Sequence, residues 1–268
     1  MRKHLGAALL LGLGALTALP AAAVETTPSS TAATTGAWHD LALAIANEEQ
    51  IQASSKRLLD AMMEQFAQDP DMAEMETEFP GLLQSFRSAM TPLIQSEIAH
   101  TTPLYRADLE ALYREKLSEP HTREATAFVT SPQFQRFLET YGKNARMRTT
   151  ARDLVKTDKV TSDAILSDVR SSALQTSLQM DGADLRYMEE FYATEAGINF
   201  KALNPAKIEI DRKWANYVSP EASAQVVPLV LNAMIEHVGK TDPETAAAMR
   251  ENLAGLIEAG EAAVPAAQ

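Results

Sequence analysis

Two glutamate–histidine pairs have a spacing that places both side chains on one face of a helix. Glu97 precedes His100 by three positions, and His121 precedes Glu124 by three. Di-iron helical bundles combine two Glu-x-x-His pairs with two further glutamates. Here the second pair has the reverse order, and no matching carboxylates are evident. We therefore interpret these residues as solvated polar faces, with a metal site as the alternative.

A methionine pair offers a second kind of chemistry. Met72 and Met75 lie in "QDPDMAEMETEFPG" (68–81), where two prolines and a glycine predict a loop. Thioether sulfurs can hold Cu(I), but methionine also fills irregular gaps in helical cores. We favour the core interpretation and predict no metal and no cofactor.

Most catalytic signatures are missing from the sequence. It contains no HExxH, G-x-S-x-G, S-x-x-K or phosphate-binding loop, and without cysteine it has no thiol nucleophile. We expect a non-catalytic protein that binds a protein partner or an apolar ligand. A hydrolase or metal-dependent enzyme with an unrecognised site is one alternative, and a structural envelope component is another.

One basic segment departs in sign from the rest of the chain. The stretch "KNARMRTTARDLVKTDK" (143–159) carries six basic and two acidic residues. On one helix its cations would form a continuous basic stripe of Arg148, Arg152, Lys156 and Lys159. The stripe is either a solvated face that pairs with the protein's own acids or a docking face for an anionic partner.

The N-terminus predicts export. Arg2 and Lys3 precede fifteen residues without a charge (5–19), and three alanines (21–23) follow Pro20. This order is typical of a cleaved secretory signal peptide, here 1–23. An uncleaved anchor is the alternative, although fifteen residues fall short of the roughly 20 that cross a bilayer. We expect a soluble periplasmic protein without a stable membrane anchor.

The charge of the mature chain limits its partners. Cleavage after Ala23 leaves 22 basic against 36 acidic residues, a formal net charge of −14. Such a surface repels phosphate backbones and anionic lipids, so we exclude nucleic acid as a partner. With no cysteine there is no disulfide, and one sizeable core or two smaller cores in contact must hold the fold.

Helical spacing and helix boundaries predict an all-α fold, a multi-helix array of amphipathic helices. Ser219 before Pro220 and Asp242 before Pro243 are strong helix starts. Pro92 should bend or restart a helix, and Gly239 is expected to end one. We expect a flexible leader (24–36), a helical domain (37–260) that ends at Gly260, and a disordered tail (261–268).

Two similar stretches predict two helix-break-helix corners. "AFVTSPQFQRF" (127–137) and "EFYATEAGINF" (190–200) each place an aromatic residue, a capping residue, a helix restart and a second aromatic residue in order. Aromatic residues at helical spacing usually lie in the core, so we assign both corners a structural role. Their residues are Phe128, Ser131, Pro132, Phe134 and Phe137, and then Phe191, Tyr192, Gly197 and Phe200.

The corners carry a family resemblance. "FY-x-S-P-x-G" after an acidic amphipathic helix resembles the hallmark of the bacterial exported family catalogued as domain of unknown function 2059. The first copy has Phe128 and Ser131-Pro132 but Val129 for the tyrosine, and the second has Phe191-Tyr192 and Gly197 but no Ser-Pro. The resemblance extends loosely over 38–214. It implies an all-helical exported domain and no known activity.

Overall fold

The computed structural model describes residues 36–157 and 159–262, which fold into helices without a strand. In chain order these are α2 (Ala37–Ile45), α3 (Glu48–Gln68), α4 (Pro70–Glu78), α5 (Leu82–Lys116), α6 (Glu119–Val129), α7 (Pro132–Asn144), α8 (Arg148–Thr157), α9 (Ser162–Ser177), α10 (Gly182–Ala193), α11 (Glu195–Ala202), α12 (Asn204–Ala215), α13 (Pro220–Gly239) and α14 (Pro243–Ala262). The predicted all-α fold is confirmed. The predicted signal peptide and most of the leader lie outside the described residues.

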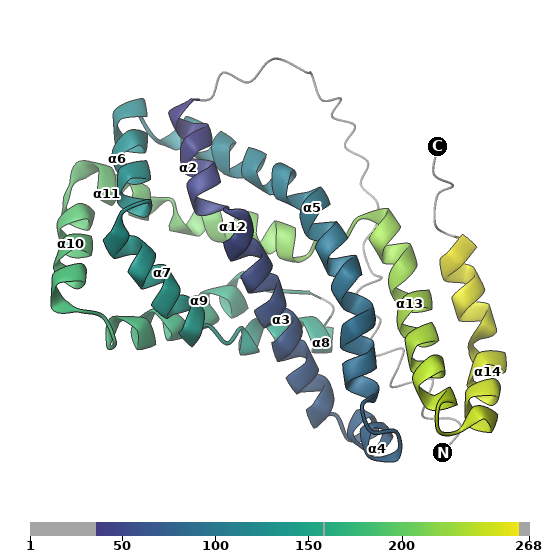
Figure 1. Cartoon of the computed structure of the whole chain (residues 1–268). Helices are drawn as coiled ribbons and strands as arrows, with labels where there is room; N and C mark the ends of the chain where they lie inside the picture. Colours follow the sequence, from purple (N-terminus) through teal and green to yellow (C-terminus); the bar gives the residue numbers. More distant parts are fainter. Residues whose placement is uncertain (1–35, 158, 263–268) are drawn as a thin grey trace.

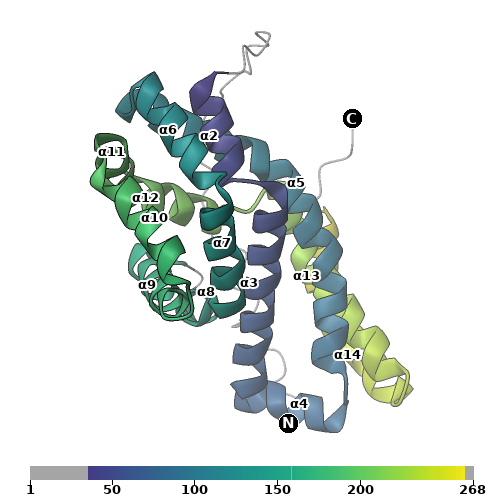
Figure 2. The same cartoon turned by 60° about the vertical axis from the view of Figure 1, so that its left-hand side comes forward.

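The long helix α5 organises the molecule. It runs beside α3, and α4 joins the two helices at one end. Helix α13 packs along the first half of α5, and α12 packs further along it (Figures 1 and 2). Helices α13 and α14 form a hairpin on one side of α5, and α6 to α12 lie on the other (Figure 1). No helix among these residues combines the length and the apolar character needed to cross a membrane.

Two hydrophobic cores lie along α5. The first half of α5 contributes Leu82, Phe86 and Met90 to a core shared with α3, α4, α8, α13 and α14. The second half contributes Leu109 and Tyr113 to a core shared with α2, α6 and the α10–α12 region. The first core is rich in methionine and aliphatic side chains, whereas the second is rich in aromatic rings.

Side-chain caps set most helix starts. A serine, threonine, asparagine or aspartate side chain accepts a hydrogen bond from the first turn, which satisfies backbone N–H groups that have no intrahelical partner. The capping residues are Asn47, Asp69, Ser118, Ser131, Thr161, Asp181, Thr194, Ser219 and Asp242. The predicted starts at Ser219-Pro220 and Asp242-Pro243 are confirmed, and α13 ends at Gly239 as expected.

Two boundary predictions are wrong. The expected loop at 68–81 contains α4, because Asp69 caps a new helix and Pro70 occupies its first turn. Helix α14 runs past Gly260 to Ala262, so Gly260 does not end it. Of the bend or restart expected at Pro92, the restart does not occur: α5 continues through Pro92 to Lys116, and its axis bends along its length (Figure 1).

Candidate functional site

The two predicted corners meet at the centre of the aromatic core. The Phe128 ring stacks on the Phe191 ring with 3.9 Å between centroids and 9° between planes. Phe134 lies against Phe128 at 4.8 Å, and Tyr192 meets Phe128 edge-on at 5.4 Å. Phe128 is only 2% exposed. We call these four rings the aromatic junction.

The other corner residues surround this junction. Phe137 stacks on Phe134 at 5.7 Å, and Phe200 lies 6.3 Å from Phe191. Helix α6 packs against α11 and α7 packs against α10, so the first helix of each corner contacts the second helix of the other (Figure 1). The aromatic residues therefore join the two corners to each other.

The turn at each corner has a local cause. Ser131 Oγ accepts from the Phe134 N–H at 3.3 Å, with Pro132 in the first turn of α7. Thr194 Oγ1 accepts from the Gly197 N–H at 3.0 Å. A Cβ atom at Gly197 would lie 2.0 Å from the Phe191 carbonyl oxygen, so only glycine permits this close approach of α10 and α11.

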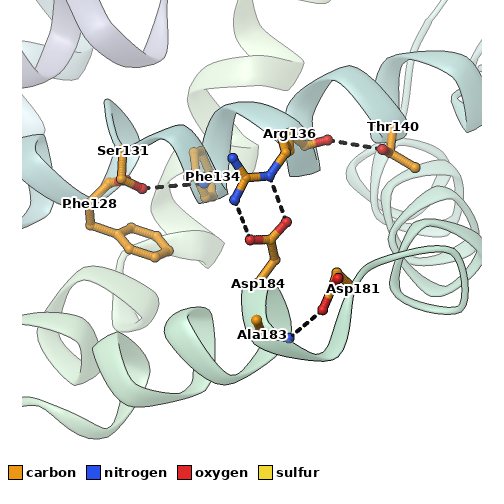
Figure 3. A network of polar contacts seen from close by, with 8 residues as sticks. All are labelled: Phe128, Ser131, Phe134, Arg136, Thr140, Asp181, Ala183 and Asp184. Carbon is orange, nitrogen blue, oxygen red and sulfur yellow. Dashed lines mark hydrogen bonds and ion pairs between the residues drawn. The ribbon is translucent and has the colours of Figure 1, made fainter.

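A buried carboxylate connects the corners in a way that the sequence did not indicate. Arg136 of α7 donates two hydrogen bonds to Asp184 of α10, Nε to Oδ2 at 2.8 Å and Nη2 to Oδ1 at 2.5 Å (Figure 3). Asp184 is 7% exposed. Its hydrogen bond with Arg136 holds the pKa of the Asp184 carboxyl below its usual value. The pair is a charged link between α7 and α10.

A second polar cluster, also missed from sequence, joins α5 to α12. Tyr105 donates to Asp211 Oδ1 at 2.8 Å, and Lys207 Nζ lies 2.7 Å from Asp211 Oδ2. Burial lowers the pKa of Lys207, but the nearby Tyr105 and Asp211 more than offset this and raise it. Burial also raises the pKa of Tyr105 and that of Tyr113, the latter to about 12. Because its hydrogen bonds tie α5 to α12, we assign the cluster a structural role.

The glutamate–histidine pairs do not converge. Glu97 accepts from the backbone N–H and the hydroxyl of Ser219 at 2.8 and 2.7 Å, which fixes the start of α13. His121 Nδ1 lies 3.2 Å from Asn199 Nδ2. The solvated interpretation is therefore wrong for Glu97 and His121, while His100 and Glu124 are exposed. Within residues 36–157 and 159–262, no cluster of histidine and carboxylate groups could hold a metal ion.

The methionine pair belongs to the first hydrophobic core. Met72 and Met75 are 9% and 7% exposed and pack with other buried residues of α3, α5 and α13. Thioethers enclosed by apolar side chains contribute packing, and the core interpretation of this pair is confirmed.

The basic stripe borders a polar groove. The groove lies between α3 and α8 and has a volume of about 420 Å³. We call it the α3–α8 groove; its lining residues are Glu64, Gln65, Gln68, Arg148, Thr149 and Arg152. Sequence reasoning found the two arginines but not the α3 residues, because nothing in the spacing of 64–68 indicates that α8 packs on α3.

The stripe is shorter than predicted. Arg148, Arg152 and Lys156 occupy exposed positions on α8, but the helix ends at Thr157. Lys159 lies beyond that end, so its predicted place on the same helical face is wrong. Only the first two members line the groove.

Most carboxylates near α8 have other partners. Asp168 of α9 accepts from the backbone N–H groups of Thr149 and Thr150 at 3.1 and 2.8 Å, and so caps α8. Asp153 accepts from the Thr161 hydroxyl at 2.7 Å. Glu64 lies 3.8 Å from Arg148 Nε, and both side chains are mostly exposed, at 58% and 69%. In the described parts of the chain, Arg152 and Lys156 form no ion pair.

In comparisons with known proteins, no family model matches this chain, and neither a curated protein nor a solved structure does. Its resemblance to the domain of unknown function 2059 family stays a prediction. In its described residues the chain is an all-helical protein with two hydrophobic cores and a polar groove between α3 and α8.

Proposed function

We propose that this chain is an exported, non-catalytic protein of the cell envelope that docks an anionic protein partner on the basic face of α8. The single observation that carries the proposal is the α3–α8 groove, where Arg148 and Arg152 stand exposed in a protein that is otherwise strongly acidic. Charge complementarity of this kind steers association and selects partners.

The non-catalytic assignment has its own support. The residues that suggested chemistry in the sequence have structural partners: Glu97 fixes the start of α13, and Met72 and Met75 fill a core. The exported assignment rests on the signal-like segment 1–23.

A pull-down from envelope extract tests docking. The wild-type bait is compared with an Arg148→Ala/Arg152→Ala bait, and with an Arg186→Ala/Arg250→Ala control that removes the same charge from exposed positions on α10 and α14. We expect the wild type and the control to recover a partner that the Arg148/Arg152 variant loses. Recovery should fall between about 0.1 M and 1 M salt, where the screening length shrinks from about 10 to 3 Å. Identical recovery by all three baits would defeat the proposal.

Export is tested separately by cell fractionation and N-terminal sequencing. We expect a periplasmic protein whose first residue lies near Val24. Recovery of the protein from the membrane pellet with Met1 still at its N-terminus would contradict the proposed export with cleavage.

A further inference from the structure

The two walls of the α3–α8 groove offer different chemistry. Helix α8 supplies two guanidinium groups one turn apart, from Arg148 and Arg152, together with Thr149. Helix α3 supplies the amides of Gln65 and Gln68, also about one turn apart. Guanidinium groups pair with carboxylates in a fork geometry, and a primary amide both donates and accepts hydrogen bonds. An extended peptide with acidic side chains offers carboxylates to the guanidinium groups and backbone N–H and C=O groups to the amides.

Glu64 already shows what the arginines attract. Its Oε2 lies 3.8 Å from Arg148 Nε, beyond a normal hydrogen bond, and both side chains are mostly exposed. An exposed pair at this distance contributes little, so a better-placed carboxylate can displace it. Glu64 therefore engages Arg148 only weakly at the edge of the groove.

The groove suits a peptide better than a compact anion such as phosphate. A phosphate group needs donors alone, and the backbone N–H groups that could supply them at the start of α8 are engaged by Asp168. A peptide can place its carboxylates at the arginines and its backbone along the glutamines.

We propose that the α3–α8 groove binds an acidic peptide segment of a protein partner, with carboxylates paired to Arg148 and Arg152, peptide groups bonded to Gln65 and Gln68, and Glu64 in competition. This assignment rests on the proposed docking function and adds the chemistry of the segment that docks.

Fluorescence anisotropy with the full mature chain and a labelled glutamate-rich peptide tests the assignment. Arg148→Ala and Arg152→Ala should each weaken binding about five- to tenfold, because each removes a charge-assisted contact. Lys156→Ala removes the same charge from the same face outside the groove and should weaken binding less than about twofold. Glu64→Gln should tighten binding, since the competing carboxylate is gone.

Two results would overturn the assignment. One is an equal loss from Lys156→Ala and Arg152→Ala, which would mean that the peptide senses only the general charge of α8. The other is equal competition by inorganic phosphate and by an unlabelled glutamate-rich peptide at the same charge concentration. A glutamine-rich peptide should not compete. Thermal melts of each variant confirm that the helices stay folded.

The two proposals fail differently. If the peptide result is negative but the pull-down still depends on Arg148 and Arg152, the docking face stands and the acidic peptide is wrong. If the pull-down is identical for all baits, the docking function itself fails, whatever the peptide does.

Discussion

The aromatic junction is built from the repeated corner stretches 127–137 and 190–200, and the α3–α8 groove is built in part from the basic segment 143–159. At the junction, Phe128 is 2% exposed and stacks on the ring at the equivalent position of the second corner. At the groove, Arg148 is mostly exposed and its ion-pair partner lies 3.8 Å away. Most aromatic rings of the corners pack into the second hydrophobic core, whereas Arg148, Arg152 and Lys156 are exposed to solvent. Substitutions in the two regions should therefore change different properties.

The largest effect is expected from Phe128→Ala. Removing a fully buried ring that contacts three other aromatic rings of the junction should lower the free energy of unfolding by about 3–5 kcal/mol. Phe137→Ala is the matched control, since Phe137 is only partly buried and should cost less. Chemical denaturation of both variants measures the difference. Unchanged stability with lost partner binding would mean that Phe128 serves a ligand.

The next effect comes from Gly197→Ala. Alanine normally favours a helix over glycine by up to about 1 kcal/mol, but here its Cβ would overlap the Phe191 carbonyl oxygen at 2.0 Å. We expect the overlap to prevail, with a net loss of about 1–3 kcal/mol. Gly255→Ala in α14 is the control, because its Cβ meets no atom within 4 Å and should stabilise the protein. A stabilised Gly197→Ala variant would show that the α10–α11 corner is looser than described.

A pH-dependent effect is expected at Asp184. Arg136 lowers the pKa of its carboxyl in the folded protein, so the unfolded chain takes up the proton first as the pH falls. The stabilisation is therefore fully present above the unfolded pKa of about 3.9 and is lost below it, as the pH passes through the folded pKa. Asp184→Asn should destabilise the protein at pH 7, and the difference from wild type should shrink below about pH 4. Unfolding curves over that range check this. A difference that does not change with pH would contradict the ion pair.

Local patterns predicted the helices and the corners because their causes are local. Ser131 and Thr194 cap the helices that follow them, and their bonds reach only three residues along the chain. The same local reasoning failed at Gly260, because one glycine does not end α14. At Pro92 it predicted a bend or a restart, and α5 continues there without a restart while packing on both cores.

The sequence alone did not predict which residues far apart in the chain would contact each other. The Arg136–Asp184 pair joins positions 48 residues apart, and the Glu97–Ser219 bonds join positions 122 apart. Likewise, Gln65 and Gln68 become part of a site only because α8 packs on α3. A single sequence shows which residues suit a helix face, but it does not show which faces meet.

The most direct test of the account measures stability and partner recovery on the same Arg148→Ala/Arg152→Ala preparation. Both arginines are exposed, and within residues 36–157 and 159–262 Arg148 has one weak ion pair and Arg152 has none. The free energy of unfolding should therefore change by less than about 1 kcal/mol per arginine. The partner recovered by the wild type from envelope extract should be lost. Recovery of the same proteins by the variant, or a loss of stability as large as that of Phe128→Ala, would contradict the account.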